Sequence, residues 1–126
     1  MKKFSILCLA FIYSGSMLFA QTAEKTIKVI VENPWKTAKT DEPVVIDIHS
    51  LKTGFTVKSA VVKEGNNEIP SQLDDLNFDL RADELAFVTN LPAQSKKVFT
   101  LTLSSAKTNK TYPARVFAEM LFRTAK

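Results

Sequence analysis

The most regular array of chemistry-bearing side chains is an acidic stretch in the second half of the chain. Counted from Asp75, oxygen-bearing side chains stand at positions 1, 3, 5 and 9, as Asp75, Asn77, Asp79 and Asp83. Oxygen ligands at alternate positions let a short loop fold around a hard cation, and the main-chain carbonyl at position 7, here Arg81, completes the shell. Carboxylate and carbonyl oxygens suit Ca²⁺ better than a softer metal. The spacing therefore indicates a candidate Ca²⁺ site formed by these five residues.

The same stretch departs from typical calcium loops at several positions. Such loops usually place glycine at position 6, and often at position 4, because the sharp turn needs a residue without a Cβ atom. Leu80 and Phe78 occupy these positions, and position 12, a bidentate Glu in EF-hands, is Ala86. The alternative is a solvated acidic turn, capped by Asp74 or Asp75, in which Phe78 and Leu80 pack onto the protein.

Catalysis has less support in the residue pattern. Clustered carboxylates can act as an acid and base pair in sugar hydrolysis, but the regular spacing fits cation ligation better. His49 is the only histidine, and it stands two residues after Asp47 in a predicted strand. This pair has the chemistry of a general base, yet no Ser or Cys nucleophile can be nominated beside it. We therefore expect no catalytic residue and no enzyme activity from this chain alone.

Trp35 is the only tryptophan, and it follows the first predicted strand in a polar loop. An indole ring in such a loop can stack on the face of a sugar, which makes Trp35 a candidate residue for binding a glycan. Alternatively, the ring caps the end of the fold.

Six segments in which polar and apolar residues alternate predict β-strands. Turn signals separate them at intervals of about ten residues, and the pattern predicts a mainly β fold, an antiparallel β-sandwich of immunoglobulin-like type. Gly65-Asn66-Asn67 is typical of a hairpin turn, and Pro70 confines its strand to an edge or irregular position. The predicted strands are Thr26 to Glu32, Val44 to His49, Phe55 to Glu64, Glu68 to Leu73, Leu85 to Asn90 and Lys97 to Ser104.

The N-terminus has the pattern of an export signal. Lys2 and Lys3 precede an apolar run, and Ala20 precedes the polar Gln21. This predicts a signal peptide over residues 1–20, cleaved after Ala20, the alternative being an uncleaved anchor. The apolar run is shorter than the roughly 20 residues that a membrane-spanning helix needs. We expect an exported protein, periplasmic or extracellular, with no membrane contact after signal removal.

Charge and cysteine content argue against other classes. The chain has 17 Lys and Arg against 13 Asp and Glu, but its basic residues are scattered and form no stripe with aromatics. Nucleic acid is therefore not an expected partner. Cys8, the single cysteine, lies in the predicted signal as a small hydrophobe, so the mature chain would have no disulfide and no thiolate metal site.

One domain is expected at residues 21–105, followed at 106–126 by a connector and the start of a further domain. The last segment is apolar enough to need burial, although its period does not separate strand from helix. Its apolar residues are Val116, Phe117, Met120, Leu121 and Phe122.

Several strings of residues resemble the N-terminal region of a family of secreted bacterial proteins of unknown function, whose genes accompany polysaccharide-degradation systems. The most specific are Ser71-Gln72-Leu73-Asp74-Asp75 and Ala82-Asp83-Glu84-Leu85, and further strings start at Val31, Thr40 and Thr111. Members are several times longer, with a β-rich body after the point where this chain stops. The resemblance implies a role in carbohydrate processing, a following domain and a truncated chain. It assigns no catalytic residue to this chain.

Together these features favour a non-catalytic β-sandwich accessory module of an exported carbohydrate-processing protein, with a glycan and a following domain as partners. One alternative is part of a secreted polysaccharide-degrading hydrolase or lyase whose catalytic body is missing. The other is a calcium-stabilised adhesion or assembly module without a sugar role. No cofactor other than the candidate Ca²⁺ is indicated.

Overall fold

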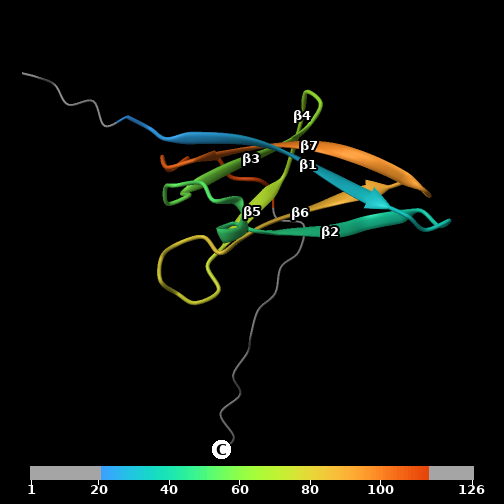
Figure 1. Ribbon diagram of the computed structural model, residues 1–126, viewed down its shortest axis with the longest axis horizontal. Coiled ribbons are helices and arrows are strands. Elements are labelled where there is room, and N and C mark those ends of the chain that lie inside the picture. Colours follow the sequence, from blue (N-terminus) through green and yellow to red (C-terminus); the bar gives the residue numbers. More distant parts are fainter. Residues whose placement is uncertain (1–20, 114–126) are drawn as a thin grey trace, which may run out of the picture.

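In the computed structural model, which describes residues 21–113, the chain folds into two antiparallel β-sheets (Figure 1). The larger sheet has the strand order β1-β7-β3-β4, and the smaller one has the order β2-β6-β5. The described strands are β1 (Glu24–Asn33), β2 (Lys39–Asp47), β3 (Ser59–Glu64), β4 (Asn67–Ile69), β5 (Ser71–Asp74), β6 (Glu84–Leu91) and β7 (Ser95–Ser104). The two sheets pack face to face, which confirms the predicted β-sandwich.

The helical content of residues 21–113 is one short 3-10 helix, η1 (His49–Leu51). Within these residues no helix has the length and apolar character needed to cross a membrane. The expected signal peptide, and the apolar tail after Pro113, lie outside the described residues.

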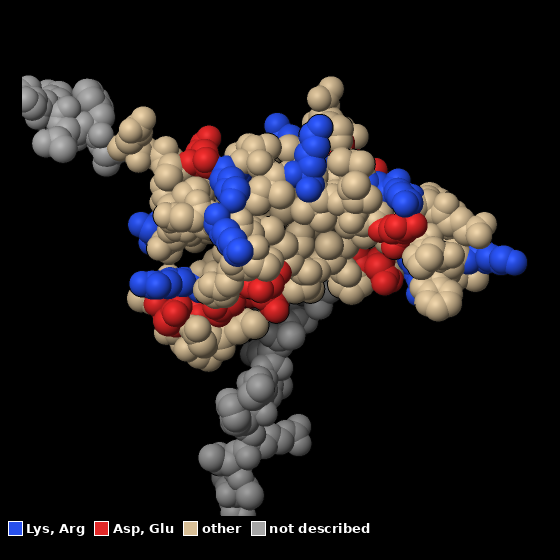
Figure 2. Space-filling view, viewed as in Figure 1, with Lys and Arg blue, Asp and Glu red and all other residues tan. Residues whose placement is uncertain are grey.

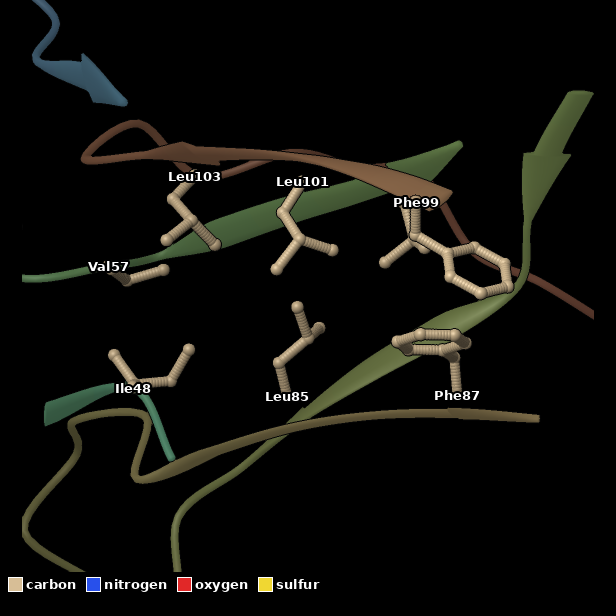
Figure 3. Close-up of a cluster of buried hydrophobic side chains, with 8 residues drawn as sticks. Ile48, Val57, Leu85, Phe87, Phe99, Leu101 and Leu103 are labelled. Carbon is tan, nitrogen blue, oxygen red and sulfur yellow. The ribbon is translucent and has the colours of Figure 1, made fainter. Parts of the chain in front are cut away.

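The alternating pattern locates the strands because one side of each strand faces the core. On β7, Phe99, Leu101 and Leu103 are fully buried, and they point toward Leu85 and Phe87 of β6 (Figure 3). The rings of Phe87 and Phe99 lie 5.0 Å apart between centroids, tilted by 57°. Ile48 and Val57 close one end of this apolar layer. The core thus joins strands of both sheets and holds them together by burial of apolar surface.

Three predicted strands differ from the observed ones, and the first difference is that the strand predicted from Phe55 begins only at Ser59, as β3. The other two are the second and fourth predicted strands. The segment predicted to begin at Val44 begins at Lys39 as β2, and its pairing with β6 is irregular between Lys39 and Glu42. At the other end β2 stops at Asp47, so the prediction that His49 belongs to this strand was wrong. His49 instead begins η1, which turns the chain away from the sheet edge.

Pro70 marks the point where the chain passes from one sheet to the other. Before it, β4 pairs with β3 in the larger sheet, and after it β5 pairs with β6 in the smaller sheet. Proline cannot donate a ladder hydrogen bond, so it suits a break between two strands. The predicted irregular position of Pro70 is confirmed, and the single strand predicted from Glu68 to Leu73 is in fact two short ones.

Candidate functional site

The acidic segment forms a loop that projects from one end of the sandwich between β5 and β6 (Figure 1). Its base is closed by the backbone N–H of Asp83, which donates to the carbonyl of Asp74 over 2.8 Å. Acidic side chains gather over this loop on the face seen in Figure 2. The two sheets thus hold the ends of the loop and leave its middle in solvent.

Three predicted ligands bind the loop's own backbone. Asp75 accepts hydrogen bonds from the N–H groups of Asp79 and Leu80, at 3.2 and 2.8 Å. Asn77 accepts a second bond from the Asp79 N–H at 2.9 Å, and Asp79 accepts one from the Arg81 N–H at 2.9 Å. These side-chain-to-backbone bonds are typical of Asp and Asn in turns. The structure therefore brings Asp75, Asn77 and Asp79 together around one turn.

Phe78 and Leu80 have left-handed backbone conformations, with φ of 61° and 67°. These are positions 4 and 6, where calcium loops usually carry glycine, so the backbone adopts the glycine conformation without glycine. The expectation that both side chains pack onto the protein was wrong, because Phe78 is 89% and Leu80 94% exposed. Both side chains therefore point away from the loop and into solvent.

Asp83, unlike the other predicted ligands, contacts a side chain outside the loop. Its Oδ1 lies 3.0 Å from Nε2 of His49, and its Oδ2 accepts the backbone N–H of Leu76 at 2.8 Å. The hydrogen bond with Asp83 raises the pKa of His49, and the same contact, with help from the Leu76 N–H, lowers the pKa of Asp83. The pair therefore links η1 to the base of the loop by a charge-assisted contact when the imidazole is protonated.

This contact was missed in the sequence because the two residues are 34 positions apart, and Asp47 stands much closer to His49 along the chain. Asp47 in fact accepts the His49 backbone N–H at 2.9 Å rather than facing its ring. Within residues 21–113 no group of three or more His, Cys, Asp or Glu is arranged to hold a metal ion. In this structure the acidic side chains of the loop accept hydrogen bonds from the loop's own backbone, and Asp83 pairs with the imidazole of His49.

Trp35 lies at the opposite end of the fold from the acidic loop, in the turn after β1. Its side chain is 65% exposed, so it does not cap the sandwich. Its backbone is nevertheless held at both groups: the N–H donates to Asn33 Oδ1 at 3.2 Å, and the carbonyl accepts the Gln94 N–H at 2.9 Å. The structure thus presents an open indole ring on a backbone fixed to the neighbouring turn.

A groove of about 710 Å³ lies between β3 of the larger sheet and β5 of the smaller sheet, and sequence reasoning did not find it. Its lining comes from β3, β5 and β6, from Pro43 of β2, and from residues 108–113, which we call the exit segment. These parts are far apart in sequence and carry no motif. Only the sheet order brings them together.

A small ionic cluster at this groove holds the exit segment. Tyr112 donates its hydroxyl hydrogen bond to Glu68 of β4, and Lys110 forms an ion pair with the same carboxylate. Partial burial, and then the bond to Glu68, raises the pKa of Tyr112 to about 12, while Lys110 and Tyr112 lower the pKa of Glu68. The phenol therefore stays protonated and keeps donating throughout the physiological pH range.

The model of a known protein family matches most of the chain. The family model described as "Domain of unknown function (DUF4861)" matches residues 31–126. No curated protein matches the sequence.

Proposed function

We propose that this chain, which belongs to the DUF4861 family, is a non-catalytic accessory module that contacts glycans in an exported carbohydrate-processing protein. The single observation that carries the proposal is Trp35. Large apolar side chains tend to be buried, and this ring stands 65% exposed on a backbone that two hydrogen bonds fix. A rigid, open aromatic face is the feature with which proteins stack on sugar rings.

The surroundings of the ring support the same proposal. It stands on a two-sheet sandwich held together by one buried apolar cluster, a scaffold that can present an open ring to a ligand. Export is supported by the N-terminal pattern of Lys2, Lys3 and Ala20, and carbohydrate work by the family resemblance. We place the module in the periplasm or outside the cell, ahead of a further domain in longer relatives.

Trp35→Ala is expected to weaken binding to an immobilised polysaccharide about tenfold, which corresponds to roughly 1.4 kcal/mol. This loss is at the upper end of the about 0.5–1.5 kcal/mol measured for aromatic contacts. A polysaccharide array of neutral and acidic classes, followed by titration of the best ligand, measures it. Phe78→Ala is the matched control, because it removes an aromatic residue that is even more exposed, 89% against 65% for Trp35, from the acidic loop.

Three results would overturn the proposal. Absence of binding to every polysaccharide by the wild-type chain would remove the glycan role. Equal weakening by Trp35→Ala and Phe78→Ala would indicate nonspecific adsorption by exposed rings. Hydrolase or lyase activity of the purified chain would contradict the accessory assignment.

A second candidate function, a calcium-stabilised adhesion or assembly module, is favoured by the backbone of Phe78 and Leu80. A left-handed conformation costs roughly 1–2 kcal/mol for a residue with a Cβ atom, and the loop holds two of them at the glycine positions of calcium loops. Each carboxylate offers about four lone-pair sites, so hydrogen bonds to backbone N–H groups leave capacity for a cation. We propose Asp75, Asn77, Asp79 and Asp83, with the Arg81 carbonyl, as its ligands.

Calcium is then expected to raise the melting temperature. If the dissociation constant is about 10⁻⁴ M, as in extracellular modules, roughly 10 mM Ca²⁺ adds about 2.7 kcal/mol. For a domain of this size that corresponds to a shift of about 10 °C or more in differential scanning calorimetry. The double variant Asp75→Asn, Asp79→Asn should lose the shift, and Mg²⁺ at the same concentration should give a smaller one. A melting temperature that does not move would remove calcium from the function.

A further inference from the structure

The acidic loop, residues 75–83, carries apolar side chains on its outside. Leu76, Phe78 and Leu80 are 61%, 89% and 94% exposed, and they alternate with the polar residues of the loop. Large apolar side chains are normally buried, and a group of them in solvent marks an interaction site. Because hydrogen bonds to Asp75 already hold the backbone, the loop loses little freedom when a partner covers these side chains.

The loop region also concentrates the negative charge of the chain. Residues 74–84 contain five acidic side chains and one Arg, whereas the rest of residues 21–113 contains seven acidic and eleven basic ones. With His49 neutral, the loop region therefore has a formal charge of −4 and the rest of the described chain +4. Such a distribution steers two copies toward a head-to-tail encounter, because a symmetric encounter of two acidic loops is repulsive.

The groove between β3 and β5 has the complementary character. Its lining is largely apolar, and the charged side chains among its described lining residues are Lys58 and Lys110. Lys110 is paired with Glu68, so the exposed Lys58 supplies the remaining positive charge. The volume of about 710 Å³ lies within the roughly 300–1,000 Å³ of pockets for small molecules, so a Phe and a Leu side chain fit. The described lining includes no residue of the acidic loop, so the loop and the groove are separate surfaces.

We propose that the groove of one copy of this chain receives Phe78 and Leu80 from the acidic loop of a second copy. The two apolar side chains then leave water for a lining that includes Val61 and Val88, and the loop carboxylates approach Lys58. Because the two contacting surfaces differ, one copy keeps a free loop and the other a free groove, and the contact repeats into open chains or rings. This inference goes beyond the glycan role and requires neither a sugar nor a bound cation.

Sedimentation equilibrium of the full chain tests the proposal. The mass of the wild-type chain is expected to rise with protein concentration and to exceed that of a dimer. Two double variants each remove one half of the contact: the loop variant, Phe78→Ser with Leu80→Ser, and the groove variant, Lys58→Glu with Val61→Glu. Each should associate at least about tenfold more weakly than the wild type, because a few central side chains carry most of the binding energy of an interface.

Ile30→Ser with Val98→Ser is the matched control. These two side chains are 64% and 50% exposed and stand opposite each other on the outer side of the larger sheet, away from the groove lining. The control variant should therefore associate as the wild type does. Equal weakening by the control and the loop variant would overturn the proposal, because it would assign the association to exposed apolar residues in general.

A mixture of the two double variants identifies the contact. The loop variant keeps an intact groove and the groove variant an intact loop, so together they should form a dimer with one copy of each and nothing larger. A mixture that stays monomeric would overturn the proposal, as would undiminished association of the loop variant or a wild-type chain that is monomeric up to about 1 mM. Should urea denaturation show that the groove variant does not fold, Lys58→Glu alone replaces it, and the loop variant against the control still decides.

Discussion

Phe99→Ala is expected to lower the free energy of unfolding by about 3–5 kcal/mol, the range for removing a buried aromatic ring. Phe99 is fully buried on β7, the strand that lies between β1 and β3, and its ring contacts Phe87 across the sandwich. The variant therefore loses apolar burial and leaves a cavity between the two sheets. Since domains are stable by only about 5–15 kcal/mol, this loss removes a large share of the total.

Urea denaturation followed by circular dichroism measures this loss, and Val98→Ala is the matched control. Val98 is the neighbour of Phe99 on the same strand, but it points outward and is 50% exposed. Its truncation should cost about 0.5 kcal/mol or less. A loss below about 1 kcal/mol for Phe99→Ala, or equal losses for both variants, would contradict a core in which β7 packs against β6.

The strands that the sequence predicts best are those whose alternation comes from a single buried side. On β7, residues 99, 101 and 103 are all buried, and the same period is visible in the residue types. The start of β2 was missed because Thr40, Asp41 and Glu42 are polar, and Asp41 takes a left-handed φ of 50° in an irregular pairing. Local propensity there favours a loop, and the partner strand β6 overrides it.

The acidic loop was predicted in part. Spacing alone places Asp75, Asn77 and Asp79 on one turn, because Asp and Asn bind backbone N–H groups a few residues away. The absence of glycine at positions 4 and 6 predicted that the loop would not have the backbone of a calcium loop. Phe78 and Leu80 nevertheless both have the left-handed conformation that glycine usually adopts at these positions. The hydrogen bonds of the three polar side chains offset part of the steric cost, which a single-residue preference does not include.

Contacts between distant segments could not be predicted from residue patterns. The pairing of His49 with Asp83, and the groove beside the exit segment, both depend on which strand lies next to which. The order β1-β7-β3-β4 follows from no local signal, since the alternation of β1 and β7 shows which side of each is buried but does not show which strand lies next to it. Sequence periodicity indicates which side of a strand is buried, but it does not indicate which strand pairs with it.

Asn33→Ala is expected to cost about 1–3 kcal/mol of stability, because it leaves the buried Leu91 carbonyl and two partly buried carbonyls without their donor. Asn33 is only 2% exposed at the end of β1. Its amide nitrogen lies 2.9 Å from the Thr37 carbonyl, 2.8 Å from that of Pro92 and 3.3 Å from that of Leu91. One side chain thus joins the turn that carries Trp35 to the turn between β6 and β7.

Two further variants separate the hydrogen bonds of Asn33 from its volume. Asn33→Asp keeps the shape but exchanges the donor for a carboxylate among three carbonyls, so it should destabilise at least as much as Asn33→Ala. Asn66→Ala, in the exposed β3-β4 turn, should change stability by about 0.5 kcal/mol or less. Denaturation midpoints at neutral pH compare the three variants. If Asn33→Asp retained wild-type stability, the amide would not be the donor that links the turns, and the Trp35 backbone would need another support.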